Sequence, residues 1–191
     1  SLRNITIMGG TIGYGAFYGC TPLESIVLPE NLTSIGVKAF SSCMNLLSIT
    51  IPKTVIEIGD SAFLGCSRLK TVNIPENSDL TTISYKAFRD CYALEAIYIP
   101  ANVGLIEEYT FYGCRKLLTV SFDENSILYS IGNNAFAYCT ILESINIPAG
   151  VTWISDTAFS NSPKLIYEIY DGNVKYLGNW VFGVVDKTLV S

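Results

Sequence analysis

The strongest constraint in this sequence is a phenylalanine that returns every 23 or 25 residues, usually after an alanine and three residues before a cysteine. Residues 39–43, 62–66 and 87–91, for example, read AFSSC, AFLGC and AFRDC. The repeated residues are Phe17, Phe40, Phe63, Phe88, Phe111, Phe136, Phe159 and Phe182. A fixed period of this length is the sequence signature of a repeat protein.

The other columns of the repeat are also apolar, and the unit reads approximately L-x-x-I-x-I-P-x-x-V-x-x-I-G-x-x-A-F-x-x-C-x-x. Its first part alternates apolar and polar residues, which predicts a half-buried strand that ends at the proline. The segment before the I-G step predicts a second, shorter strand. The five residues from the alanine to the cysteine, called here the AF box, predict a short helical or 3₁₀ segment.

A unit of about 23 residues is too small to bury its own apolar face, so the units must stack into a solenoid with a parallel sheet on one face. The two 25-residue units carry their extra residues in one polar turn, PENSDL at 75–80 and DENSIL at 123–128. An insertion confined to a turn leaves the apolar columns in register. The pattern therefore predicts that this turn, including Ser78 and Asp79, is exposed.

These columns resemble the BspA-type leucine-rich repeats, which are found mostly in bacterial surface proteins. The match extends from Leu2 to about Phe182, in about eight units of 23–25 residues, although Ser162 replaces the cysteine of its unit and Glu168 stands where isoleucine is expected. The resemblance implies a right-handed leucine-rich-repeat stack that forms one domain, residues 1–191, of a longer protein. It also implies an extracellular or cell-surface location and a non-enzymatic role in adhesion or protein binding.

Composition narrows the classes of partner. Of the 191 residues, 49% are hydrophobic and 15% are charged, which is enough apolar content for a folded core. The formal net charge is −5 and no basic run is present, so nucleic acid is not an expected partner. The apolar runs are only a few residues long, and no membrane insertion is expected within this chain.

Six evenly spaced cysteines could be metal ligands, a disulfide framework, reactive thiols or packing residues. The chain has no histidine and no paired cysteines, which argues against a metal site. Neighbouring strands lie about 4.8 Å apart. The Cα atoms of disulfide-bonded cysteines are about 4.4–6.8 Å apart, so the distance alone would permit disulfides between neighbouring units. Equivalent side chains in a stack point in parallel, however, and Ser162 and Val185 replace two cysteines. We therefore predict reduced, buried thiols that pack as small apolar residues.

The sequence gives little support for a catalytic or cofactor-binding motif. Without histidine, a serine or cysteine nucleophile lacks its commonest base. The stretch GGTIGYGAF at 9–17 lacks the third glycine of a dinucleotide-binding fingerprint. No enzymatic activity, cofactor or metal is expected.

The first candidate site is the outward face of the longer strands, which is small, polar and nearly uncharged. Its residues are Ser48, Thr50, Thr71, Asn73, Tyr98, Thr119, Ser121, Ser144 and Asn146. This face would offer shape and hydrogen bonds to a protein or glycan, such as a host matrix protein or another bacterial surface protein. The alternative is a solvated ladder of sheet-forming residues that binds nothing.

The second candidate is an aromatic contact column of Leu105, Trp153 and Tyr176, which occupy one outward position of the short strands. Tyr129 and Tyr167 add aromatic surface nearby. Trp and Tyr are enriched at binding hot spots, and neither end of the chain reads as a polar cap, so this column would serve a ligand or end-to-end self-association. The alternative is ordinary exposed surface, since aromatic residues also occur there without partners. Two functions remain open: a surface binding module, and a structural spacer that presents another domain.

Overall fold

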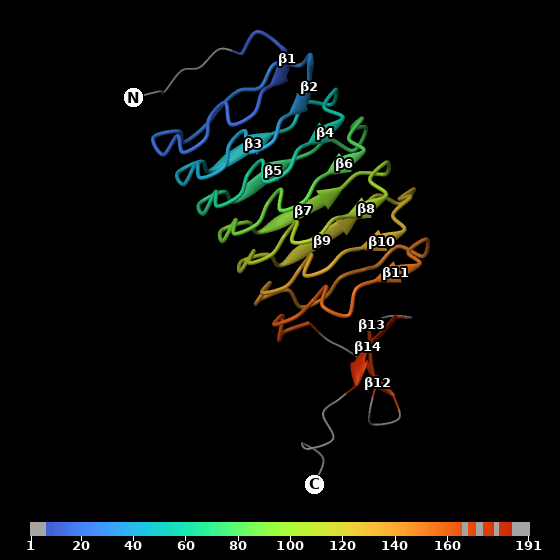
Figure 1. Cartoon of the computed structure of the whole chain (residues 1–191). Coiled ribbons are helices and arrows are strands. Elements are labelled where there is room, and N and C mark those ends of the chain that lie inside the picture. The colour runs from blue at the N-terminus through green and yellow to red at the C-terminus, as the bar shows by residue number, and fades with distance from the viewer. Residues whose placement is uncertain (1–6, 166–167, 171–173, 178–179, 185–191) are drawn as a thin grey trace.

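The computed structural model describes residues 7–165, 168–170, 174–177 and 180–184, and most of these residues form a stack of short parallel strands joined by turns (Figure 1). One flank carries the sheet of β3 (Ser48–Thr50), β5 (Thr71–Asn73), β7 (Ala96–Ile99) and β9 (Thr119–Phe122). A second flank carries β1 (Gly10–Ile12), β2 (Leu32–Ile35), β4 (Glu57–Ile58), β6 (Thr82–Ile83), β8 (Leu105–Ile106), β10 (Ser130–Ile131) and β11 (Trp153–Ile154). The prediction of a parallel repeat solenoid is confirmed.

Strand pairing follows the sequence repeat, so that equivalent positions of neighbouring units lie side by side. Ser48 lies opposite Thr71 on the first flank, and Ile35 lies opposite Ile58 on the second. The side chains alternate as the sequence pattern predicts, with Ile49 buried between exposed neighbours in β3. Register is preserved from unit to unit because a one-residue slip would move these apolar side chains to the solvent face.

The core is built around a continuous stack of phenylalanine rings. Consecutive rings of the seven phenylalanines from Phe17 to Phe159 have centroids 5.0–5.6 Å apart and lie within 11° of parallel. The five rings from Phe40 to Phe136 are fully buried, whereas Phe17 is half-buried. The predicted phenylalanine column is therefore the spine of the solenoid.

The AF box is not helical, and the predicted helical or 3₁₀ segment is wrong. The amide of Ala39 donates to the carbonyl of Gly36 in its own unit at 3.1 Å, but that of Phe40 donates to Ala62 in the next unit at 2.7 Å. A helix would require consecutive amides to bond within the segment. The box is instead a series of turns. In the described part of the chain, no helix has the length and apolar character to cross a membrane.

Left-handed backbone angles occur just before the AF box and just before its cysteine in most units, which also interrupts any helix. Lys38 and Ser42 have φ of 55° and 62°, and the equivalents of Ser42 in two other units are Gly65 and Gly113, at 70° and 73°. Glycine has no steric penalty at positive φ. This conformation explains why glycine precedes cysteine in several boxes.

The glycine of the I-G step is needed for a different reason: the backbones of neighbouring units approach closely at this position. A Cβ atom at Gly59 would lie 2.9 Å from the backbone nitrogen of Val37 and 3.0 Å from the carbonyl carbon of Gly36. No side chain fits there without moving the backbone of the preceding unit.

Within the described residues the stack has about six turns, so the predicted count of about eight units is too high. Beyond Leu165, β12 (Glu168–Tyr170), β13 (Val174–Leu177) and β14 (Trp180–Val184) form a separate antiparallel sheet. Glu168 breaks the apolar pattern of the repeat in this region. The local sequence therefore no longer favours another repeat turn.

The inserted turn is only partly exposed, which corrects the prediction for Ser78. Asp79 is exposed as expected, but Ser78 is 5% exposed, and its hydroxyl accepts a hydrogen bond from the amide of Leu80 at 3.2 Å. Ser126 accepts a similar bond from Leu128 in the other long unit. This serine fixes the shape of the longer turn.

Candidate functional site

The polar face predicted from the sequence lies on the flank of β3, β5, β7 and β9. Eight of its nine residues are exposed, and Tyr98 is half-buried. The hydroxyl of Tyr98 donates to Asp123 Oδ2 at 2.6 Å; burial and this hydrogen bond raise the pKa of Tyr98 to about 12. Ser144 and Asn146 are exposed beyond the edge of the sheet, in a segment without strand pairing. The structure brings these residues onto one surface; ligand binding there stays a prediction.

This polar face contains a hollow of about 710 Å³ beside β9. Thr119 and Ser121 of β9 line one side, Ser144 and Asn146 line another, and the inserted turn at 123–126 contributes to its wall. Within the described residues, no backbone hydrogen bond joins β9 to residues 143–147, and the two segments leave a space between them. The column alignment missed this hollow because it assumes that every unit pairs with the next.

Only some residues of the predicted aromatic contact column lie together in the structure. Ser130 of β10 pairs with Leu105 of β8 on one side and with Trp153 of β11 on the other. Tyr129 joins Leu105 and Trp153 around a cavity of about 350 Å³. Leu105, Trp153 and Tyr129 therefore lie on one surface, and a contact role for them stays a prediction.

The placement of Tyr176 in this column is wrong. Tyr176 lies in β13, opposite Glu168 and Val181 in the antiparallel sheet, rather than beside Trp153 in the parallel one. The physical reason is the loss of the repeat pattern after Leu165. Tyr167 lies outside the described residues.

A tyrosine cluster along the AF boxes was missed by the sequence analysis. The rings of Tyr85 and Tyr109 meet edge to face at 6.1 Å, and those of Tyr112 and Tyr138 are 5.1 Å apart. The guanidinium of Arg89 lies 4.8 Å above the Tyr112 ring, within cation–π range. These tyrosines occupy different columns of the repeat, so a search by column does not group them. A search for aromatic residues flanking the box phenylalanines would have found them.

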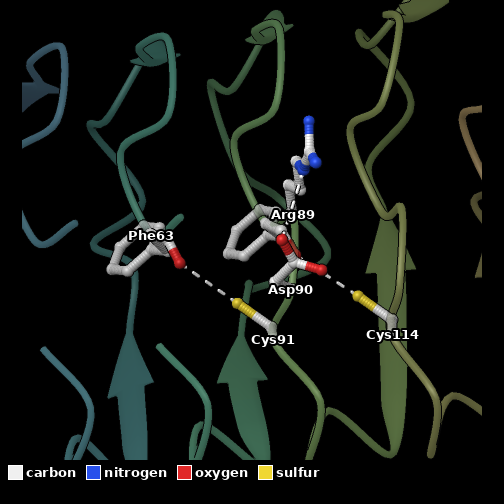
Figure 2. Close-up of polar contacts among 6 residues, drawn as sticks. Phe63, Arg89, Asp90, Cys91 and Cys114 are labelled. Atoms are coloured by element: carbon white, nitrogen blue, oxygen red, sulfur yellow. Dashed lines mark hydrogen bonds and ion pairs between the residues drawn. The ribbon is translucent and has the colours of Figure 1, made fainter. Parts of the chain in front are cut away.

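The cysteines form a ladder of hydrogen bonds rather than a chemical site. In Figure 2, the thiol of Cys91 points towards the backbone carbonyl oxygen of Phe63, which accepts its hydrogen bond at 3.2 Å. The thiols of Cys43, Cys66, Cys114 and Cys139 bond in the same way to the preceding unit, at 3.0–3.4 Å. Burial raises the pKa of Cys91 and Cys114, which keeps both thiols protonated as donors.

All six cysteines are unpaired, and all except Cys20 are buried, which agrees with a packing position. The prediction of a purely apolar role is incomplete, because the position also requires a donor. Ser162 demonstrates this requirement: its hydroxyl donates to the carbonyl oxygen of Phe136 at 2.9 Å. Among the described residues, no cluster of potential ligands could hold a metal ion.

Two substitutions of Cys114 should separate the contribution of packing to stability from the contribution of hydrogen bonding. We expect Cys114→Val to lower the free energy of unfolding by about 0.5–1.5 kcal/mol, because the carbonyl of Phe88 loses its thiol donor and keeps only the hydrogen bond from the Cys91 amide. Cys114→Ser should cost less, since the hydroxyl can replace the thiol as it does at Ser162. Urea unfolding followed by circular dichroism measures both variants. If valine is tolerated better than serine, the hydrogen bond has no role in stability.

Short parallel strands, a buried aromatic spine and 23–25-residue units define the chain as a leucine-rich-repeat solenoid. The family model described as "BspA type Leucine rich repeat region (6 copies)" matches residues 1–118 and 105–188. The chain belongs to this family, as the sequence resemblance indicated.

Solved structures of bacterial repeat proteins have the same fold. A leucine-rich repeat protein from Bacteroides ovatus is 32% identical with a TM-score of 0.72, over 85% of this chain and 47% of that one. A second, from Eubacterium ventriosum, is 28% identical with a TM-score of 0.67, over 78% and 39%. The pneumococcal vaccine antigen PcpA shares the fold at 24% identity and a TM-score of 0.67, over 92% and 44%. The chain thus matches less than half the length of each structure, and no curated protein has a matching sequence.

Proposed function

We propose that this chain is a non-enzymatic binding module of a bacterial protein at the cell surface or outside the cell. The observation that supports this proposal most directly is the hollowed polar face along β3, β5, β7 and β9. A concave surface with several hydrogen-bonding groups and little charge offers complementarity of shape to a protein or glycan ligand. Membership of the BspA-type family and the bacterial relatives support the same class of function.

The ligand of this proposal contacts the hollow beside β9. Thr119, Ser121, Ser144 and Asn146 present hydroxyl and amide groups around a space of about 710 Å³. The inserted turn adds the carboxylates of Asp123 and Glu124 at its rim. The hydrogen bond from Tyr98 lowers the pKa of Asp123, so this carboxylate is ionised at neutral pH and accepts hydrogen bonds.

Binding to immobilised host matrix proteins and to a glycan array tests this function. We expect at least one ligand to bind the 191-residue chain, and Ser121→Arg to reduce that binding at least about tenfold because arginine fills the hollow. The matched control is Ser34→Arg on β2, on the other flank of the solenoid, which should bind normally. Equal effects of the two variants would contradict a ligand in the hollow.

The alternative of a structural spacer draws support from the unbroken ring stack between Phe17 and Phe159. A spacer needs regular stacking but no ligand. Absence of binding to every matrix protein and glycan would favour it over the binding module.

A further inference from the structure

A narrow slot lies on the second flank of the solenoid, away from the hollowed face. Its floor is Ser130 of β10, and its two walls are Leu105 of β8 and Trp153 of β11, both paired with Ser130 in register. Parallel strands are about 4.8 Å apart, so the two large residues stand roughly 10 Å apart with a small one between them. The cavity that results has a volume of about 350 Å³.

The floor of the slot has unused hydrogen-bonding capacity. Ser130 is 7% exposed, lines the cavity and makes no side-chain hydrogen bond within the described part of the chain. Buried hydroxyl groups normally have a partner. No buried polar atom of the described residues is sealed off without one, so the Ser130 hydroxyl opens into the slot, where a ligand could bond to it.

Two carboxylates lie at the rim of the slot. Glu107 and Glu108 line the cavity, and Asn133 holds Glu108 in place by donating to its Oε1 at 2.9 Å. The ion pairs of the described residues are Arg89–Asp90 and Lys164–Glu143, so neither glutamate has a cationic partner there. Burial raises the pKa of Glu107, a hydrogen bond from the backbone of Tyr85 opposes that rise, and the nearby carboxylates of Asp60, Glu57 and Glu108 add to it.

The aromatic residues of the slot remain open to solvent. Trp153 is 51% exposed and Tyr129 is 53% exposed, and both line the cavity. A cation near an aromatic face gains electrostatic attraction, most strongly with tryptophan. The slot thus combines aromatic surface, two carboxylates without a cationic partner and a hydroxyl without a side-chain hydrogen bond among the described residues.

We propose that this slot binds the side chain of an arginine from a protein partner. A guanidinium is planar and stacks on Trp153 or Tyr129, and its five N–H donors can reach Glu107, Glu108 and the Ser130 hydroxyl. A neutral ligand would leave the two carboxylates uncompensated, which is why the charge favours arginine. This inference rests on the proposed function in treating the chain as a binding module, but it uses a different surface.

Nuclear magnetic resonance on the 191-residue chain tests the slot with N-acetyl-arginine amide as the probe. We expect a saturable shift of the Trp153 indole N–H signal, which Trp153→Phe identifies by its disappearance. The uncharged isostere N-acetyl-citrulline amide should bind at least about fivefold more weakly, because it keeps the shape of the ligand and loses its charge.

Three variants locate the interaction. Glu107→Gln should weaken arginine binding at least about fivefold, and Ser130→Leu should abolish it by filling the floor between Leu105 and Trp153. Glu24→Gln, an exposed glutamate outside the slot, should bind as the parent does. An undisturbed amide spectrum shows that each variant is folded.

Equal binding of arginine and citrulline, or a response to N-acetylglucosamine in place of arginine, would overturn the proposal in favour of an uncharged or glycan ligand. No response to any probe would overturn it as well. Failure of the slot is distinguishable from failure of the proposed function, because Ser121→Arg should leave the arginine response unchanged while removing binding at the hollow.

Discussion

Raising the pH above about 9 should unfold this chain steeply, because the folded state holds five thiols in their protonated form. Burial raises the pKa of Cys43 and Cys139 to about 12, and also raises those of Cys66, Cys91 and Cys114. In the unfolded chain a thiol titrates at about 8.5. Above that pH the unfolded state binds fewer protons than the folded state, so the free energy of unfolding falls as the pH rises towards the folded-state pKa values.

The expected slope is large. Each buried thiol removes about 1.4 kcal/mol per pH unit in this range, so five of them remove about 7 kcal/mol per pH unit. That figure is comparable with the whole stability of a typical domain, about 5–15 kcal/mol. Urea unfolding between pH 7 and pH 10.5, under reducing conditions, measures the slope.

The double variant Cys91→Ser, Cys114→Ser isolates the thiol contribution, because serine donates the same hydrogen bond and does not titrate. Its slope should be about two fifths smaller than that of the parent, since two of the five buried thiols are gone. An unchanged slope would mean that other groups, such as the tyrosines, cause the alkaline unfolding.

Replacing Phe88 with alanine should lower the free energy of unfolding by about 3–5 kcal/mol, as large-to-small changes in a core do. Phe88 is fully buried, and its ring is stacked between Phe63 at 5.1 Å and Phe111 at 5.6 Å. The substitution leaves a cavity in the middle of the spine and removes both ring contacts. Chemical denaturation followed by circular dichroism measures the loss.

Two controls test whether the ring stack causes this loss. Phe17 is half-buried and stacks only on Phe40 among the described rings, so Phe17→Ala should cost less than Phe88→Ala. Asp79→Ser changes an exposed turn residue and should cost under about 0.5 kcal/mol. Equal losses for Phe17→Ala and Phe88→Ala would contradict a spine in which burial determines stability.

The sequence was sufficient to predict the solenoid, because its apolar columns can be buried together only by stacking in register. The spacing of Phe40, Phe63 and Phe88 alone indicates that equivalent rings meet. The conformation of the AF box could not be predicted in the same way. It depends on the amide of Phe40 bonding to Ala62 in the next unit, a contact between residues far apart in the chain.

The candidate sites were predicted less completely than the core. Alternation in the strands identified the exposed face and brought Leu105 and Trp153 to one surface. The slot between them requires a small residue at Ser130, and the hollow beside β9 requires a break in strand pairing. Tyr176 was misplaced because an antiparallel hairpin and a degenerate repeat give similar apolar spacing over a few residues.

The contacts that the AF box makes at a junction between two units do not depend on how many units the stack contains. Within the described stack, neighbouring units meet through the same kinds of contact: an amide of the box bonds to the next unit, a thiol or the Ser162 hydroxyl bonds to the previous one, and one ring packs against another. Duplication or deletion of a whole unit by recombination would restore all of these contacts at the new junction. The same contacts therefore fit stacks of different length, while each AF-box residue that makes them is constrained by both neighbouring units.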